Sequence, residues 1–176
     1  MSLKTGPAPT TAPLPTMSDD PTSKEGKQES PGHDQLRIYV DADVLFAGAS
    51  SPSDFSASQV LLTLSEITLV EGITSSLAVD ECQRNLEAKL PEATGDFNRL
   101  VRRALSVWEA PPREELLPYV GRADWKDLPH LVSAFRAECR YLTRYNIEDY
   151  KPGHSDVEVV RPGALVRRVR EKLSTL

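Results

Sequence analysis

The sequence predicts a three-layer α/β/α domain with a mostly parallel central sheet, for three reasons. Short apolar runs of strand length alternate along the chain with longer segments whose apolar residues recur at helical spacing. The first apolar run leads directly into a helix-like segment, as in the βα units of parallel sheets. The chain has 176 residues, 39% of them hydrophobic, which is enough for one core of ordinary size. We therefore expect one domain over residues 37–176.

Residues 1–36 differ in composition from the rest of the chain. They hold six of the 14 prolines and no aromatic residue, so they bury too little apolar surface to offset the entropy of ordering them. We predict a disordered N-terminal tail. The tail has no apolar run of signal-peptide length, and no later segment approaches the roughly 18 apolar residues of a membrane span. These features predict a soluble, cytoplasmic protein without membrane contact.

Charge and cysteine content narrow the range of functions. The net charge of −5 argues against bulk electrostatic binding of nucleic acid, so a substrate that carries phosphate would need a local basic patch or a metal. Cys82 and Cys139 have no CxxC partner and fall in helical patterns. They are predicted to be free, buried thiols rather than a disulfide or a zinc site.

The first half of the domain is predicted to begin with a strand over residues 37–40. Residues 44–49 then start a short helix or loop that ends near Gly48. Ser53 or Asp54 can cap a second helix, whose apolar residues keep helical spacing as far as Ile67.

A second strand is expected within residues 68–74, followed by a helix capped by Ser75 or Ser76. A further helix spans Phe97 to Leu105, and residues 107–109 form the third strand.

In the second half, residues 113–121 favour a short helix. A longer helix begins near Asp127, with Cys139 on its apolar face. Strands are predicted at residues 140–143 and 157–160, and Pro162 opens the last helix.

Acidic and amide side chains follow the predicted strands or begin the neighbouring helices, at the sheet edge where α/β proteins bind ligands. They are Asp41, Asp43, Glu81, Asp127, Asn146 and Asp149. Clustered carboxylates repel one another unless a cation neutralises them, and Mg²⁺ and Mn²⁺ prefer such oxygen ligands. The pattern predicts metal-assisted hydrolysis of a phosphate ester.

Four segments, in this order, resemble the PIN-domain family. They are residues 38–46 (IYVDADVLF), 74–81 (TSSLAVDE), 124–134 (DWKDLPHLVSA) and 141–150 (YLTRYNIEDY). The resemblance implies a PIN-like α/β fold and a Mg²⁺- or Mn²⁺-dependent endoribonuclease, often the toxin of a VapC-type toxin–antitoxin pair. RNA would be the substrate, and an antitoxin protein and a second copy of the chain are the candidate partners.

On matching positions, the resemblance makes Asp41, Glu81 and Asp127 the catalytic, metal-binding acids. Asp43 stands where many members have Asn and adds a candidate metal ligand. Asn146 stands where many have a fourth Asp, and its carbonyl oxygen can bind a metal or orient water, but it cannot act as a general base.

Three neighbouring residues are predicted to support this site. Thr143 has either a functional reading, holding water or an acid, or a structural one in its strand. Asp149 is a supporting acid or an ordinary turn residue. Arg144, in the loop beside the site, is the first candidate for a phosphate contact.

Two other functions remain open from the sequence. Asp41-Ala42-Asp43 also resembles the opening of haloacid-dehalogenase-type phosphatases, in which the first Asp is a nucleophile, but no paired-Asp motif follows. A PIN-like domain without the fourth acid could instead bind RNA or a protein and cleave nothing.

Overall fold

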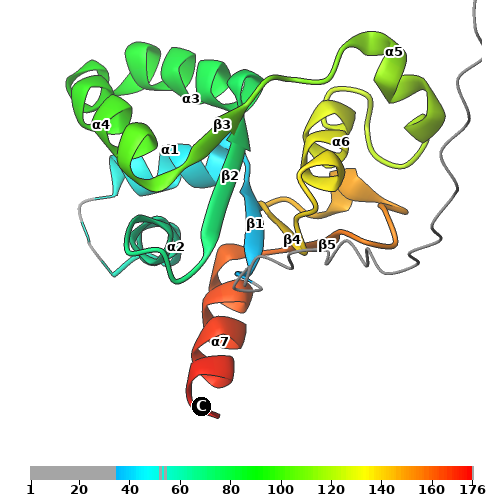
Figure 1. Ribbon diagram of the computed structural model, residues 1–176. Coiled ribbons are helices and arrows are strands. Elements are labelled where there is room, and N and C mark those ends of the chain that lie inside the picture. The colour runs from blue at the N-terminus through cyan, green and yellow to red at the C-terminus, as the bar shows by residue number, and fades with distance from the viewer. Residues whose placement is uncertain (1–34, 52, 54, 176) are drawn as a thin grey trace, which may run out of the picture. The chain divides into compact units, whose positions relative to one another are not determined.

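Five parallel strands form the middle layer of the computed structural model, which describes residues 35–51, 53 and 55–175 (Figure 1). Most of the predicted tail, residues 1–34, lies outside the described residues. The strands are β1 (Arg37–Val40), β2 (Glu71–Ser75), β3 (Ser106–Trp108), β4 (Tyr141–Thr143) and β5 (Glu158–Val160). They lie in the order β3-β2-β1-β4-β5, and every neighbouring pair is parallel.

Helices cover both faces of this sheet, as the sequence predicted (Figure 1). The α-helices are α1 (Ala42–Ser50), α2 (Ala57–Glu66), α3 (Ser76–Lys89), α4 (Thr94–Ala104), α5 (Arg113–Leu116), α6 (Leu128–Arg136) and α7 (Pro162–Leu173). Short 3-10 turns are η1 (Pro91–Ala93), η2 (Leu117–Tyr119) and η3 (Glu148–Tyr150). None of the helices in the described part of the chain has the length and apolar character that crossing a lipid bilayer requires.

Alternation along β1 separates two cores. Ile38 and Val40 pack with residues of α1 to α4 and α7, whereas Tyr39 packs with residues of α5 and α6. The chain builds outward from β1 to β3 and then returns to place β4 on the other side of β1. Because parallel crossovers are right-handed, this reversal puts α5 and α6, which connect β3 to β4, on the opposite face from α1 to α4. The switch in strand order therefore lies between β1 and β4, where open α/β sheets bind ligands.

Residues 68–70 were predicted to begin the second strand, and this is wrong. Thr68 adopts a left-handed conformation with φ of 62°, and the amides of Leu69 and Val70 donate to the Leu64 carbonyl. These residues terminate α2, because hydrogen bonds to its last carbonyls satisfy groups that a strand would leave open. The N-terminal cap of α2 is Ser56, whose hydroxyl accepts from the Gln59 amide, rather than Ser53 or Asp54.

Cys139 was placed on a helical face, but it lies beyond the end of α6. Glu138 takes a positive φ of 54°, and the Cys139 amide donates to the Ala134 carbonyl, which closes the helix. Cys82 does lie in α3, and both thiols are free and buried as predicted. Burial raises the pKa of each thiol to about 12.

The predicted start of the first helix, α1, is also wrong. The first helix begins at Ala42, two residues earlier than predicted, and continues through Gly48 to Ser50. Gly48 allows close packing here, since a Cβ at this position would lie 2.4 Å from Leu62 Cδ1.

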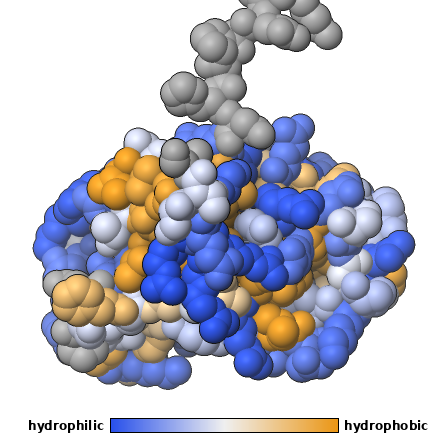
Figure 2. Space-filling model, turned by 90° about the horizontal axis from the view of Figure 1, so that it is seen from below, coloured by the Kyte–Doolittle hydropathy of each residue, from blue (hydrophilic) through white to orange (hydrophobic). Residues whose placement is uncertain are grey.

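Large hydrophobic residues are also exposed on the described surface, among them Phe55, Leu117 and Val120. Figure 2 shows hydrophobic patches separated by hydrophilic residues on the face seen from below Figure 1. The predicted homodimer stays a prediction.

Gly72 is required by close packing between β2 and its neighbours. A Cβ at this position would lie 2.5 Å from Ser65 Oγ and 2.8 Å from Leu105 Cδ2. Gly72→Ala is therefore expected to lower the free energy of unfolding by about 1–3 kcal/mol through overpacking. Urea denaturation measures this change. Gly95→Ala is the control, because the nearest atom lies 3.9 Å away and alanine favours the helix; an equal loss in both variants would contradict the packing explanation.

Candidate functional site

Asp41 ends β1 at the switch in strand order and caps α1. Its side chain is almost fully buried, yet both oxygens are engaged. Oδ1 accepts from the Ala42 amide at 2.7 Å, and Oδ2 accepts from Arg144 Nη1 and the Tyr150 hydroxyl, each at 3.0 Å. Burial and the charge of Asp41 raise the pKa of Tyr150 well above its ordinary value, so the hydroxyl remains a donor. The carboxylate of Asp41 is thereby fixed in one orientation.

Arg144 follows β4 and lies at the centre of the acids. Its Nη1 also contacts Asp127 Oδ1 at 2.5 Å, and its Nη2 donates to Asp149 Oδ2 at 3.3 Å. Its Nε lies 3.9 Å from Asp43 Oδ2. Burial alone would lower the pKa of the guanidinium, but Asp41 and its other partners raise it above the ordinary value. Arg144 is thus a charged counter-ion to four carboxylates. The sequence predicted Arg144 as a phosphate contact and did not predict this role.

Asp127 precedes α6 but does not cap it. The side chain makes no capping hydrogen bond, and Oδ2 is buried without a hydrogen-bond partner among the described residues. The Asp127 side chain is therefore not held in place by capping the helix. A buried carboxylate oxygen without a hydrogen bond costs free energy. Lys126 Nζ lies 4.0 Å from Oδ2, too far for a hydrogen bond, so this oxygen is available to a ligand or metal ion.

Asp43 lies in the first turn of α1, with Oδ2 accepting from the Tyr145 amide at 3.0 Å. Its Oδ1 is buried without a hydrogen-bond partner among the described residues. Burial, and next the charge of Asp41, raise the pKa of Asp43 to about 6. Asp43 is therefore protonated more readily in the folded protein than in the unfolded chain, although it is still mostly ionised at pH 7. The contribution of protonated Asp43 to the free energy of unfolding is fully present below the ordinary aspartate pKa. It is lost as the pH rises through about 6.

Asp43→Asn is accordingly expected to stabilise the metal-free protein at pH 8 by about 1 kcal/mol, a value reduced for the partial exposure of the side chain. The gain should disappear near pH 4, where the wild-type carboxyl is already protonated. Urea denaturation in a chelator at both pH values measures it. A gain that is the same at both pH values would show that the charge of Asp43 is not its origin.

Comparison with known proteins places this arrangement in a recognisable fold. PAE2754 from Pyrobaculum aerophilum has a TM-score of 0.57 at 17% identity, over 77% of this chain and 96% of that chain. VapBC2 from Rickettsia felis, bound to a DNA fragment from their promoter, has 0.54 at 14%, over 72% and 98%. The Mycobacterium tuberculosis VapC20, a sarcin–ricin loop cleaving toxin, has 0.51 at 11%, over 68% and 98%. The chain has a VapC-like PIN-domain fold.

The likeness is one of fold, since no protein-family model matches the sequence and a search of curated proteins finds no significant match. The four segments that suggested a PIN domain occupy β1 with α1, β2 with α3, the start of α6, and β4 with η3. The sheet and its helices therefore confirm the predicted three-layer α/β/α fold.

Glu81 is the predicted acid that the PIN fold does not bring into contact with Arg144. Its side chain is 48% exposed, and its Oε2 lies 3.9 Å from Nε2 of the buried His130. The opposite ring nitrogen of His130 lies 3.6 Å from Asp41 Oδ1 and 2.9 Å from the Tyr39 hydroxyl. Glu81 is therefore linked to the central acids through His130.

Asn146 and Thr143 have smaller roles in the geometry. The Asn146 amide donates to Asp149 Oδ2 at 2.8 Å, so it orients an acid of the cluster. The Thr143 hydroxyl donates to the Tyr39 carbonyl, and Thr74 in β2 makes the matching bond to the Val40 carbonyl. Both threonines hydrogen-bond β1 to a neighbouring strand, which supports the structural interpretation of Thr143 as a strand residue.

Sequence reasoning missed three residues of this site. Asp124 was not predicted as a site residue, although an acid three residues before Asp127 was a signal. His130 was not predicted as a site residue, but it follows Asp127 by three residues and so faces the same side of the chain. Tyr150 was noted only as the end of a motif.

The acids fit a hard divalent cation. One oxygen each of Asp124, Asp127 and Asp149 lie within 4.8 Å of one another. Asp127 and Asp43, which both lie near Arg144, each have one buried oxygen without a hydrogen-bond partner among the described residues. Mg²⁺ and Mn²⁺ prefer such oxygens together with water, and a cation would remove the cost of leaving them unpaired. The residues present therefore suit the predicted metal.

Proposed function

We propose that this chain is a Mg²⁺- or Mn²⁺-dependent endoribonuclease. The observation that carries the proposal is the convergence of Asp41, Asp127 and Asp149 on one cationic group at the switch in strand order. Buried carboxylates that share one positive charge, in a ligand-binding position, are typical of functional sites. The similarity of the fold to VapC20, a sarcin–ricin loop cleaving toxin, supports the choice of RNA.

In this proposal Asp41 and Asp127 are the principal metal ligands, with Asp43, Asp124 and Asp149 beside them. A bound Mg²⁺ or Mn²⁺ would polarise the scissile phosphate and generate a nucleophile from water. Tyr150 and the Ala42 amide hold the Asp41 carboxylate in place, so its orientation is set before substrate arrives. Preorganisation of this kind avoids reorganisation during the reaction.

Glu81 and His130 complete the outer part of the proposed site. Glu81 is exposed at the rim, where it can accept a proton or a water hydrogen bond, whereas His130 is buried behind it. Asn146 supplies no charge and acts by orienting Asp149. The departure from a fourth Asp is thus compensated by Asp43 and Asp124, which bring additional carboxylates to the same edge.

The non-catalytic alternative also has an observation in its favour. Arg144 neutralises the acids without a metal, so the cluster could serve as a structural salt-bridge network in a PIN-like binding domain. The phosphatase alternative has no such observation in its favour among the described residues, and the fold resembles PIN-domain proteins instead.

Cleavage of RNA by the purified protein separates these readings. The nuclease proposal predicts cleavage of a single-stranded or hairpin RNA in Mn²⁺ or Mg²⁺, and none in a chelator. Absence of cleavage with either ion, in protein shown by mass spectrometry to carry no bound inhibitor, would favour the binding domain.

A toxin role, with an antitoxin as partner, is part of the same proposal. The similarity to VapBC2 and VapC20 supports it. Induced expression of the wild-type chain is expected to arrest bacterial growth, while Asp41→Asn at equal protein level is not. Arrest by both would assign the toxicity to something other than the acids.

A further inference from the structure

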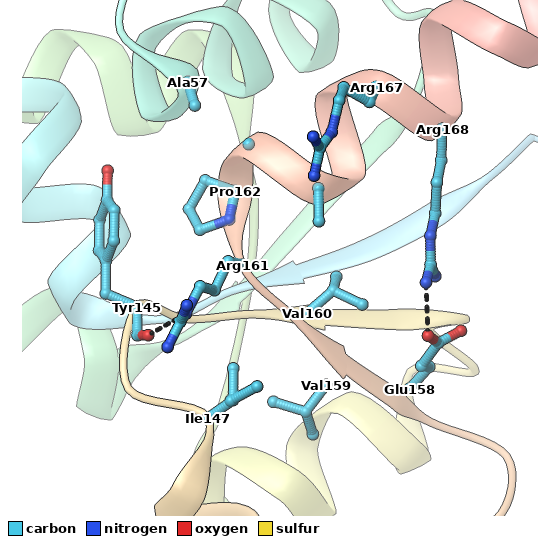
Figure 3. Close-up of a pocket in the computed structure, with 12 residues that line it drawn as sticks. Ala57, Tyr145, Ile147, Glu158, Val159, Val160, Arg161, Pro162, Arg167 and Arg168 are labelled. Atoms are coloured by element: carbon cyan, nitrogen blue, oxygen red, sulfur yellow. Dashed lines mark hydrogen bonds and ion pairs between the residues drawn. The ribbon is translucent and has the colours of Figure 1, made fainter.

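A groove lies on the β5 side of the sheet, and one of its lining residues, Tyr145, is bonded to Asp43. It encloses about 770 Å³, within the range of roughly 300–1,000 Å³ seen for ligand sites, and lies between β5, the first turns of α7 and the loop after β4 (Figure 3). Its floor is apolar, formed by Ile147, Val159, Val160 and Pro162. The groove is therefore built to receive a ligand with flat or apolar surface.

Arginines line the rim of this groove. Arg168 is paired with Glu158 at 2.8 Å, but Arg161 and Arg167 make no ion pair within the described part of the chain. Arg161 donates one hydrogen bond, from its Nε to the Tyr145 carbonyl at 3.2 Å (Figure 3). Both guanidinium groups are exposed. On a chain with a net charge of −5, this is a local basic patch.

Tyr145 connects the groove to the acids. Its amide donates to Asp43, its carbonyl accepts from Arg161, and its hydroxyl bonds to Ser58. The ring is 43% exposed and lines the groove. Because β5 is parallel to β1 and β4, the end of β5 and the start of α7 lie at the same sheet edge as Asp41. A polymer bound at the acids can therefore continue into the groove.

We propose that the groove binds the single-stranded RNA segment next to the scissile phosphate, an inference that rests on the proposed ribonuclease function. Arg161 and Arg167 contact phosphates, and Tyr145 stacks on a base above the apolar floor. An acidic peptide would satisfy the arginines as well. RNA is favoured because Tyr145, which lines the groove, is bonded to Asp43 of the acidic site and offers an exposed aromatic side chain.

The test uses Asp41→Asn as the parent, so that binding is measured without cleavage. Fluorescence anisotropy with a labelled 12-nucleotide single-stranded RNA compares the parent with a version that also carries Arg161→Gln and Arg167→Gln. Loss of two phosphate contacts is expected to weaken binding about 10-fold or more at 0.1 M salt. The slope of log K against log salt should fall by about 1.4, or about 0.7 for each contact.

The matched control replaces Arg102 and Arg170, two exposed arginines outside the groove, by Gln. Its affinity and salt slope are expected to stay near those of the parent. Arg167→Gln alone provides a second variant, because the Arg167 side chain makes no hydrogen bond or ion pair within the described residues and the variant should fold normally. Equal weakening by the control pair, an unchanged salt slope in the groove variant, or no RNA binding by the parent would overturn the inference.

Two further outcomes separate the groove from the proposed function. RNA binding that depends on the groove arginines, in a protein whose wild type cleaves no RNA, would keep the groove and reject the nuclease. If the wild type cleaves RNA, and replacing these arginines changes neither cleavage nor RNA binding, the nuclease function is kept and the groove inference is rejected. Tighter binding of an oligoglutamate peptide than of RNA through the same arginines would assign the groove to an acidic protein segment and overturn the inference.

Discussion

Asp41→Asn is expected to lower metal-dependent RNA cleavage by more than about 100-fold, because it removes a charged oxygen from the proposed metal position. The fold should persist, since an Asn oxygen can still accept from the Ala42 amide. The measurement is the initial rate of cleavage of a labelled RNA at saturating Mn²⁺, with circular dichroism to confirm folding.

Asp156→Asn is the matched control for this rate measurement. Asp156 is an exposed aspartate whose side chain is 70% accessible and lies near His154, away from the acids. It should retain the wild-type rate. If folded Asp41→Asn kept more than a third of the wild-type rate, Asp41 would not be a catalytic ligand.

Arg144→Met is expected to lower the free energy of unfolding in a chelator by about 3 kcal/mol. Removing one partner of a buried ion-pair network typically costs about 3–5 kcal/mol, and the 15% exposure of the Arg144 side chain places this case at the lower end. The carboxylates left behind repel one another. Mn²⁺ should restore more stability to Arg144→Met than to wild type, because it supplies the missing positive charge.

Urea denaturation with chelator and with Mn²⁺ measures both effects. Arg103→Met is the control, since Arg103 pairs with Glu66 at the surface and exposed pairs contribute about 0–1 kcal/mol. A loss in Arg144→Met no larger than in this control would show that the acids do not need a cation. Equal stabilisation of both variants by Mn²⁺ would show that the ion binds elsewhere.

Local sequence information was sufficient for the fold and for part of the site. The apolar run before Asp41 predicts a buried strand with an acid at its end, and the structure has that strand over Arg37–Val40. Asp127 could be placed at a helix start in the same way. Both predictions depend on residues within a few positions of one another, which is the range over which periodicity and capping act.

The remaining parts depend on contacts between distant segments. Arg144 and Asp41 are 103 residues apart in sequence, and their ion pair exists because β4 lies beside β1. The position of Arg144 at the centre of the acids therefore could not be predicted from local sequence patterns. The same holds for His130, which links Asp41 to Glu81 only after α6 packs against β1 and β2.

Element ends were the other source of error. At Thr68 and Glu138 the chain takes a left-handed conformation that ends a helix, although neither is the glycine that usually marks such a position. Hydrogen bonds back to helix carbonyls favour these turns over continuation of a strand or helix.

Calorimetric titration of Mn²⁺ into wild type and Asp41→Asn tests most directly whether these acids hold the divalent ion of the proposed nuclease. Wild type is expected to bind Mn²⁺, and Asp41→Asn to bind it at least about 10-fold more weakly, because a ligand is lost from the site. Equal affinity in the two proteins, or no binding by wild type, would contradict the proposed metal site.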